Sequence, residues 1–311
     1  MRLYTHPACL RHSAGPGHPE SPARLAAVLD ALHAADLPGI DWQEAPLATR
    51  EQLLRAHSPA LLAHVLDHPL PADGLRRIDA DTAMGIDSAE AALRAAGAVC
   101  AAVDAVLGGA TRRAFCAVRP PGHHATRDTA MGFCLFNSAA IGACHALAAH
   151  GLQRVALVDF DVHHGNGSQD IFWNEPRVMY VSSHQQALYP GTGDRDERGE
   201  RGNIVNAPLR EGADGADMRR VYSGRLLPAL DDFRPQLLLV SAGFDAHRLD
   251  PLGGLDFDAA DYGWLTGELV AIAERHGDGR VVSALEGGYS LAALRESSLA
   301  HVAALLGLAP A

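Results

Sequence analysis

Two residues near the middle of the chain, Asp161 and His163, are of types that bind metal ions and are separated by one residue. At the extended end of a strand, alternate side chains point the same way, so we expect this carboxylate and imidazole to converge. Asp245, after another apolar run, supplies a plausible third ligand. Two carboxylates and one imidazole leave a coordination position open, as a catalytic Zn²⁺ requires. Fe²⁺, Mn²⁺ and Co²⁺ accept the same ligands, so the pattern predicts a catalytic divalent metal.

A pair of adjacent histidines, His123 and His124, follows the sequence Arg-Pro-Pro-Gly. Histidines beside a metal-bound water can act as general base and general acid, because their ordinary pKa is close to neutral pH. Each histidine needs a partner on its second ring nitrogen to fix its tautomer. Asp159 and Asn166 are the candidate partners.

Aromatic residues next to glycines are candidates for the walls of such a site. Tyr289 lies in the sequence Glu-Gly-Gly-Tyr, where the glycines permit a tight turn that aims the hydroxyl inward. A phenol beside a metal stabilises a developing oxyanion. Phe133 and Tyr189 lie in glycine-rich turns and are placed to wall a narrow apolar channel. We interpret the neighbouring Cys134 as a packed thiol, because the activated water already supplies the nucleophile.

The order of the elements predicts the scaffold that positions these residues. Short apolar runs, typical of strands buried on both faces, span residues 114–118, 154–159, 178–182, 236–241 and 280–285. Helix-like stretches span residues 21–35, 88–107, 138–150, 216–233 and 259–276. The alternation predicts one α/β domain, residues 1–311, with a mostly parallel central sheet flanked by helices on both faces. Ligands of such sheets bind beyond the carboxyl ends of the strands, where the candidate residues lie.

The composition limits the class of protein. The 311 residues include 37 acidic residues and 26 basic residues, all arginine, which gives a net charge of −11. This excess of acidic residues predicts no basic surface that could bind a nucleic-acid backbone, and it weakly favours cationic substrates. No run approaches about 18 apolar residues, so no membrane partner is expected. The five cysteines form no Cys-x-x-Cys pair and no apolar signal peptide begins the chain, so we expect reduced thiols and a cytoplasmic location.

With these segments in hand, the chain resembles the histone deacetylase superfamily, which has the arginase/deacetylase fold. It is most similar to class II histone deacetylases and bacterial histone deacetylase-like amidohydrolases. The resemblance runs from Gly17-His18-Pro19-Glu20 to Glu286-Gly287-Gly288-Tyr289. The motifs that carry it are R-P-P-G-H-H-A, G-F-C-L-F-N, D-F-D-V-H-H-G-N-G, Y-P-G-T-G, S-A-G-F-D-A-H-R-L-D-P-L-G-G and L-E-G-G-Y. Their combination is far more specific than any one of them.

The resemblance implies two kinds of metal site. Asp161, His163 and Asp245 match the ligands of the family's single catalytic Zn²⁺. The family also carries a structural K⁺ near the zinc. The positions that match the K⁺ site are Asp159, Asp161, His163, Ser182 and Ser183.

The resemblance also implies the catalytic roles. His124 matches the main general base and later acid, and His123 matches its electrostatic partner. Asp159 and Asn166 match the residues that hold these two histidines, and asparagine at position 166 is the class II pattern. Tyr289 matches the tyrosine that polarises the acyl carbonyl.

The walls of the family's acyl-lysine tunnel match Gly132, Phe133 and Tyr189. The family more often has phenylalanine at the position of Tyr189, so a more polar tunnel is expected here. Leu252 matches an apolar position at the tunnel rim, where members that prefer polyamines can carry an acidic residue. The resemblance therefore implies a zinc-dependent deacetylase that removes acetyl or other short acyl groups from lysine side chains of peptides or from small acylated amines. No organic cofactor is implied, and a homo-oligomer is compatible with the sequence.

Three alternatives stay open. An acetylpolyamine deacetylase on the same scaffold is disfavoured by Leu252 and by a short loop at residues 70–88. A ureohydrolase-like dimanganese enzyme needs further bridging ligands, for which His164 and Asp159 are imaginable, but its D-A-H-x-D pattern is absent. An acyl-amine-binding protein without activity is disfavoured because the metal ligands, both histidines and Tyr289 are all present.

Overall fold

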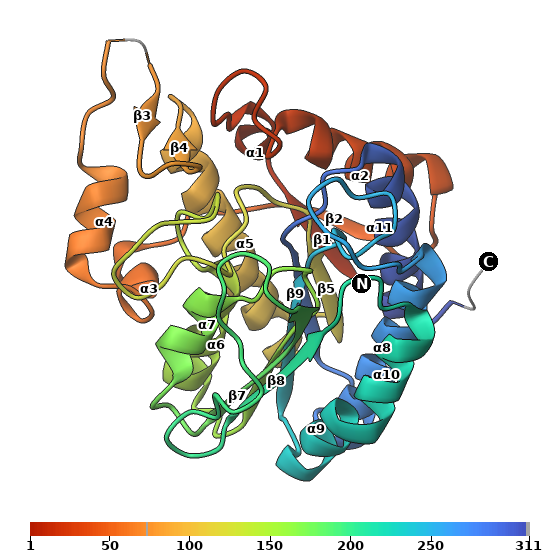
Figure 1. The fold of residues 1–311 in the computed structure, drawn as a ribbon. Helices are drawn as coiled ribbons and strands as arrows, with labels where there is room; N and C mark the ends of the chain where they lie inside the picture. Colours follow the sequence, from red (N-terminus) through yellow and green to blue (C-terminus); the bar gives the residue numbers. More distant parts are fainter. Residues whose placement is uncertain (73, 309–311) are drawn as a thin grey trace.

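The computed structural model describes residues 1–72 and 74–308 (Figure 1). Its main sheet has eight strands: β1 (Arg2–Thr5), β2 (Asp41–Glu44), β5 (Arg113–Cys116), β6 (Val155–Asp159), β7 (Val178–Gln185), β8 (Ile204–Leu209), β9 (Leu237–Ala242) and β10 (Val281–Leu285). Their order across the sheet is β2-β1-β5-β10-β9-β6-β7-β8, and each neighbouring pair is parallel. A small antiparallel hairpin, β3 (Arg76–Arg77) and β4 (Ala83–Met84), stands apart from it.

Helices cover both faces of the sheet (Figure 1). One face carries α5 (Ser88–Leu107), α6 (Ser138–His150) and α7 (Asn166–Phe172). The other face carries α2 (Pro22–Ala35), α8 (Gly215–Val221), α9 (Leu227–Phe233), α10 (Ala259–His276) and α11 (Leu291–Leu306). A π-helical turn, Tyr222–Leu226, joins α8 to α9. The remaining short helices are α1 (Pro7–Arg11), α3 (Arg50–Leu54) and α4 (Pro59–Leu66).

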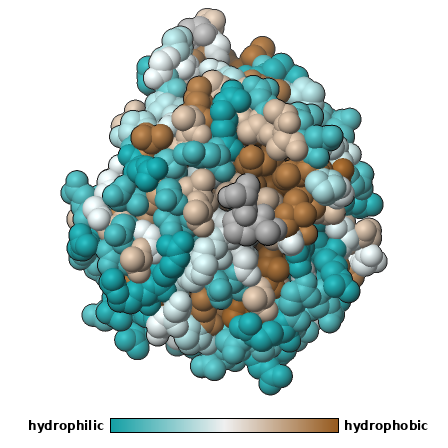
Figure 2. Space-filling model, turned by 90° about the vertical axis from the view of Figure 1, so that its right-hand side faces the viewer, coloured by the Kyte–Doolittle hydropathy of each residue, from teal (hydrophilic) through white to brown (hydrophobic). Residues whose placement is uncertain are grey.

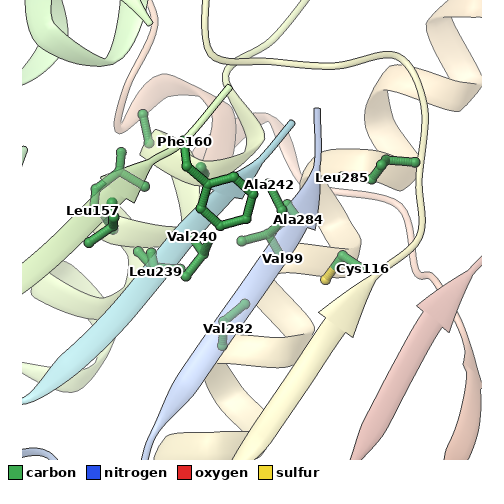
Figure 3. Packing of buried hydrophobic residues seen from close by; sticks show 14 of the residues in the cluster. Val99, Cys116, Leu157, Phe160, Leu239, Val240, Ala242, Val282, Ala284 and Leu285 are labelled. Carbon is green, nitrogen blue, oxygen red and sulfur yellow. The ribbon is translucent and has the colours of Figure 1, made fainter. Parts of the chain in front are cut away.

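The hydrophobic core fills the space between the sheet and its helices. Every residue of β6, β9 and β10 is buried. Figure 3 shows Leu239 and Val240 of β9 beside Val282 and Ala284 of β10, with Val99 of α5 packed close by. Burial on both faces explains why these strands appear in the sequence as continuous apolar runs instead of alternating patterns.

The predicted fold class is confirmed, and so are its five strands. The apolar runs correspond to β5, β6, β7, β9 and β10, with ends shifted by at most three residues. The helix predicted at residues 216–233 is one helical stretch interrupted by the π-helical turn. The prediction missed β1, β2 and β8, which lie at or next to the sheet edges, and the small hairpin of β3 and β4. It also missed α11 and the short helices α1, α3, α4 and α7.

The strand order brings distant parts of the chain to one place. Strands β5, β10, β9 and β6 are neighbours at the centre of the sheet and run parallel. Their carboxyl ends therefore lie side by side, and so do the loops that follow them. These loops carry His123, Asp161, Asp245 and Tyr289.

The face of the molecule drawn in Figure 2 is mainly polar. In Figure 2, most of the visible side chains are hydrophilic, and a hydrophobic area lies near the middle of that face. Within residues 1–72 and 74–308, no helix combines the length and the apolar character needed to cross a membrane.

Candidate active site

The three candidate metal ligands lie together beyond the carboxyl ends of β6 and β9. The ligand atoms of Asp161, His163 and Asp245 are all within 4.8 Å of one another. His163 Nδ1 lies 3.1 Å from Asp161 Oδ1 and 3.2 Å from Asp245 Oδ2. Both carboxylates are fully buried, and His163 is 9% exposed. Two buried carboxylates so close together call for a compensating positive charge.

Asp161 and His163 converge by a different route from the one we predicted. Strand β6 ends at Asp159, and the chain then bends, so our expectation of an extended segment was wrong. Asp161 Oδ1 accepts a hydrogen bond from the His163 backbone N–H at 2.9 Å, as aspartates do in tight turns. This local turn, and not strand alternation, brings the two side chains together.

The donor set and its surroundings fit a divalent metal. Asp245 Oδ2 is buried, and among the described residues it accepts no well-aligned hydrogen bond, although His163 Nδ1 lies 3.2 Å from it. Gly287 adjoins it, and a Cβ there would lie 2.0 Å from Asp245 Oδ2 and 2.5 Å from Asp161 Oδ2. Only glycine leaves the space beside both carboxylates free of side-chain atoms. Two oxygen donors and one imidazole nitrogen with an open side suit Zn²⁺ and similar ions.

The pKa values of the three candidate ligands indicate which protons a bound metal ion would displace. Burial raises the pKa of Asp245 to about 7, and the charge of Asp161 adds to this. The pKa of Asp161 is lowered, because the nearby charges of His123 and His163 outweigh the effect of burial. The pKa of His163 rises to about 10 despite burial, because both carboxylates favour its charged form. Protons therefore hold this cluster together, and a metal would displace them on binding.

Each of the adjacent histidines has the predicted partner within hydrogen-bonding distance. His123 Nδ1 lies 3.0 Å from Asp159 Oδ2, and His124 Nδ1 lies 2.8 Å from Asn166 Oδ1. Because an amide oxygen only accepts hydrogen bonds, His124 carries its proton on Nδ1 and keeps a lone pair on Nε2. The two imidazole centres are 4.0 Å apart.

The two histidines differ in charge. Burial lowers the pKa of His123, but the carboxylates of Asp161 and Asp159 outweigh it and raise that pKa well above its ordinary value. Burial lowers the pKa of His124 well below its ordinary value, and the charges of His123 and His163 lower it further. The surroundings thus favour the charged form of His123 and the neutral form of His124, and environments that push pKa values apart in this way separate acid and base roles.

Tyr289 lies in the loop after β10 and is held through its backbone. Asp250 Oδ2 accepts hydrogen bonds from the backbone N–H groups of Tyr289 at 2.6 Å and Ser290 at 3.0 Å. Burial raises the pKa of the Tyr289 phenol well above its ordinary value, so the hydroxyl keeps its proton and acts as a donor. The Arg24 guanidinium lies over the ring, 4.7 Å from its centre.

A cavity of about 220 Å³ leads to these groups. Its lining residues are Asp81, His124, Gly132, Phe133, His163, Leu188, Tyr189, Leu252 and Tyr289. All four residues expected to form a tunnel therefore line one cavity with His124, His163 and Tyr289. The Tyr189 ring stands perpendicular to the His124 ring at 5.0 Å between centres. The centres of the Phe133 and Tyr289 rings are 5.9 Å apart.

The sequence analysis missed Asp81 and Leu188 in this lining. Asp81 is exposed and lies in the loop between β3 and β4, whose position no local pattern indicates. Thr82 connects this loop to the cavity wall, because its hydroxyl donates to Asp81 Oδ1 at 3.0 Å and accepts from the Phe133 N–H at 3.0 Å. The signal that could have found the loop is the Asp-x-Asp pair formed by Asp79 and Asp81.

The residues matched to a K⁺ site lie at and just after the end of β6 and within β7. Asp159 is the register partner of Ser182. The Ser182 hydroxyl lies 2.9 Å from His184 Nδ1, and the Ser183 hydroxyl lies 3.0 Å from the Tyr222 hydroxyl. Since both hydroxyls have partners, a cation here would rely strongly on backbone carbonyl oxygens.

The alternative with a second bridging metal finds no support in His164. Its Nδ1 lies 2.8 Å from the Thr192 hydroxyl, and its Nε2 lies 3.1 Å from Gln169 Oε1. Both nitrogens are therefore engaged away from the candidate ligands. Burial also lowers the pKa of His164 to about 4, so it is neutral.

Comparisons with known proteins show which family the chain is similar to. Residues 18–305 match the family described as "Histone deacetylase domain". The "Histone deacetylase-like amidohydrolase" of Pseudomonas aeruginosa is 37% identical, over 96% of this chain and 84% of the relative. "Histone deacetylase 14, chloroplastic" of Arabidopsis thaliana is 37% identical, over 98% of this chain and 76% of the relative. The crystal structure of the HDA15 HD domain superimposes with a TM-score of 0.93 at 36% identity, covering 100% of this chain and 89% of that one.

Proposed function

Because the chain belongs to the histone deacetylase family, a family of deacetylases and amidohydrolases, we propose that it is a zinc-dependent deacetylase. Its substrates would be acylated lysine side chains or similar amines, from which it removes acetyl or other short acyl groups. The observation that carries the proposal is one cavity shared by a ligand-type histidine, a neutral imidazole and a protonated phenol. We propose that residues 1–311 form a single domain with this activity.

Asp161, His163 and Asp245 would hold the catalytic ion. When bound, Zn²⁺ would supply Lewis-acid polarisation of the amide carbonyl and a lowered pKa for a water molecule. The chain's own part is to present three ligands in a buried site with one side open to the cavity. Gly287 keeps that side free of side-chain atoms.

His124 would take the proton from the attacking water and later give it to the leaving amine. Its Nε2 is the nitrogen with a lone pair, because Nδ1 is engaged with Asn166. Its lowered pKa keeps it neutral and ready to accept a proton at neutral pH. His123, charged and held by Asp159, would stabilise the negative charge that develops nearby.

Tyr289 would donate a hydrogen bond to the oxyanion. Its hydroxyl retains its proton, because burial raises the pKa of the phenol. Its backbone is fixed by Asp250, so little reorganisation is needed when the charge appears. Gly132, Phe133, Tyr189 and Leu252 would surround the aliphatic chain of the substrate.

Acetylated polyamines are the second candidate substrates. Asp81 places an exposed carboxylate on the cavity lining, and Asp79 lies two residues away. A carboxylate at this place favours a substrate that carries a further positive charge. Leu252, which lines the same cavity, offers no such charge, and for this reason acylated lysine stays the first candidate.

Further features belong to the same proposal. A structural K⁺ would lie near Asp159, Asp161, His163, Ser182 and Ser183. A reducing compartment such as the cytoplasm suits the five cysteines, all of which are free thiols. The acidic net charge argues against a nucleic-acid partner. A homo-oligomer is compatible with these features.

One experiment tests the proposal. The purified chain is stripped of metal and reconstituted separately with Zn²⁺, Fe²⁺ or Mn²⁺. Acetate release is then measured from acetyl-lysine peptides and from acetylated polyamines, and urea release from arginine. We expect zinc-supported turnover of acetyl-lysine peptides. Turnover of polyamines alone would favour the second candidate, and urea release with two Mn²⁺ ions per chain would contradict both.

A further inference from the structure

A second cavity lies away from the candidate active site, at the open edge of the sheet. It has a volume of about 250 Å³ and is formed by the β7–β8 connection, the end of β8 and the helical stretch that contains the π-helical turn. Its main lining residues are Arg195, Ala207, Pro208, Arg220, Gly224 and Arg225. It shares no residue with the cavity that contains His124 and Tyr289. No acidic side chain is among the described residues that line it.

The positive charge in this cavity is largely uncompensated. Across the described ranges, neither the Arg195 nor the Arg225 guanidinium makes a hydrogen bond or an ion pair. Burial lowers the pKa of Arg225, and the charges of Arg195 and Arg198 lower it further, against the single opposing charge of Asp196. The guanidinium groups therefore repel one another, which an anion would relieve.

Arg220 is the third arginine of the lining, and it has a partner. Its Nη1 lies 2.5 Å from Asp217 Oδ1, and the same carboxylate also pairs with Arg210 at 3.0 Å. Because two guanidinium groups share one carboxylate, part of their positive charge remains uncompensated. In a chain whose net charge is −11, a cavity lined by three arginines and by no acidic residue is an exception that calls for an explanation.

The backbone under the cavity is well anchored. Arg225 belongs to the π-helical turn Tyr222–Leu226, a rare type of helix that is often found at functional sites. Tyr222 and Leu226, on either side of Arg225, are both fully buried, and the Tyr222 hydroxyl is bonded to Ser183 at 3.0 Å. Gly224 adds no side chain, and a Cβ there would meet nothing within 4 Å. The turn thus presents Arg225 from a fixed base next to open space.

We propose that this cavity binds a small anion that carries phosphate groups. Guanidinium groups form paired, charge-assisted hydrogen bonds with phosphate oxygens, and two groups from separate segments can hold one such anion between them. The volume lies just below the range of drug-sized ligand pockets, which suits a pyrophosphate or a small phosphate ester. Arg195 and Arg225 are the primary contacts, and Arg220 is the secondary one.

Isothermal titration of the full chain with sodium pyrophosphate tests the proposal. The variants are R195A and R225A, and the matched control is R112A, which removes an exposed arginine at the opposite end of the sheet strands. We expect saturable binding of one pyrophosphate per chain. Each of R195A and R225A should weaken it at least about tenfold, as the loss of a charged hydrogen bond implies, while R112A keeps the affinity of the original chain.

Two further measurements make the result decisive. Pyrophosphate should raise the melting temperature of the original chain and of R112A, but not that of the double variant R195A/R225A. The melting temperature of each variant without ligand shows that it is folded. No saturable binding in the millimolar range, or equal affinity in all variants, would overturn the proposal. So would arginine-dependent binding of a glutamate-rich peptide with no binding of pyrophosphate, which would indicate a polypeptide partner.

Discussion

The guanidinium carbon of Arg24 lies 4.7 Å from the centre of the Tyr289 ring, and the same group donates hydrogen bonds to the carbonyl oxygens of Gly288 and Glu286. Arg24 is fully buried, and its Nη1 pairs with Glu20 at 2.9 Å. One buried cation therefore contacts both the ring of Tyr289 and the backbone on which it is carried. Because Arg24 belongs to helix α2, this helix holds the loop after β10 in place.

The Tyr289 hydroxyl provides the first prediction. Tyr289→Phe should lower kcat by roughly 10²-fold or more, the usual cost of losing an oxyanion donor, with little change in zinc content. Steady-state kinetics on an acetyl-lysine peptide measures this. Tyr262→Phe is the matched control, because the Tyr262 hydroxyl is buried and has no hydrogen-bond partner among the described residues. Equal activity of the two variants would remove Tyr289 from the proposed mechanism.

The carboxylate of Asp245 provides the second prediction. Asp245→Asn keeps the shape of the side chain but removes a negative ligand, so zinc content should fall below one ion per chain and activity should be lost. Metal analysis after dialysis, together with circular dichroism, measures both metal and folding. Asp256→Asn, an exposed position, should retain its zinc. A folded Asp245→Asn variant that keeps a full complement of zinc would contradict the assignment of this ligand.

The third prediction concerns the pKa of His124, which we expect to determine the pH below which activity falls. His124 must be neutral to accept a proton, so activity falls as the pH drops through its pKa, which lies well below 6.5 in this site. Asn166→Asp would put a carboxylate on Nδ1 and stabilise the charged imidazole. The pKa of His124 should then rise, and the acid limb of kcat/KM should move to higher pH by about one unit or more.

The matched control for this change is Asn174→Asp, which makes the same substitution at an exposed position. It should leave the pH profile unchanged. Both profiles are measured with saturating zinc, so that loss of metal at low pH does not imitate the titration of His124. An unshifted acid limb in the Asn166→Asp variant would mean that another group is the base.

The sequence revealed the parts of the molecule that have a local signature. Strands β6, β9 and β10 are buried on both faces and stand out as apolar runs. Strand β2 reads Asp-Trp-Gln-Glu and lies at the sheet edge, so nothing in it indicates a strand. Strand β8 also lies at an edge and contains Asn206 and Pro208, which are rare in strands.

The candidate site shows the same limit. Its central residues stand in motifs at strand ends, so the sequence analysis could name them, although it expected a strand where a turn joins Asp161 to His163. Arg24 was not foreseen, because a charged residue on a helix is ordinarily exposed. Its burial is compensated by Glu20 and by carbonyl groups more than 260 residues away, which accept its hydrogen bonds. Contacts across such separations leave no pattern in a single sequence.

The buried Glu20 provides a prediction about stability. Burial disfavours its charge, but Arg119, His12 and Arg24 outweigh burial and hold the pKa of Glu20 well below its ordinary value of 4.5. The carboxylate therefore stabilises the fold above that pH, and the contribution is lost as the pH falls through the lowered pKa. Glu20→Gln leaves two buried guanidinium groups uncompensated and should cost about 3–5 kcal/mol in the free energy of unfolding at neutral pH.

Urea unfolding at several pH values measures this cost. Glu51→Gln is the control, because Glu51 pairs with Arg55 at 2.9 Å but its side chain is 82% exposed. Its cost should stay below about 1 kcal/mol. The deficit of Glu20→Gln should shrink as the pH is lowered below the ordinary pKa of glutamate. A deficit no larger than that of Glu51→Gln at neutral pH would contradict this account.

A glycine in the cavity wall provides the last prediction. Gly132 has φ +56°, and a Cβ there would lie 2.6 Å from His124 Cδ2 and 2.9 Å from Tyr189 Cε1. Gly132→Ala should therefore displace the base and lower kcat/KM strongly. Gly109→Ala is the control for backbone strain alone. Gly109 also has a positive φ, +78°, but a Cβ placed there would meet nothing within 4 Å. Both variants should lose about 1 kcal/mol or more in unfolding free energy, but only Gly132→Ala should lose activity.

Strand β10 is one of the last elements of the chain, yet it lies between β5 and β9 in the middle of the sheet. The two halves of the sheet are therefore joined only through β10, because β5 and β9 each pair with it and not with one another. Tyr289 follows β10 by four residues and lines the cavity with His124. Removing this one segment would divide the sheet and take the phenol from the candidate site in the same cut.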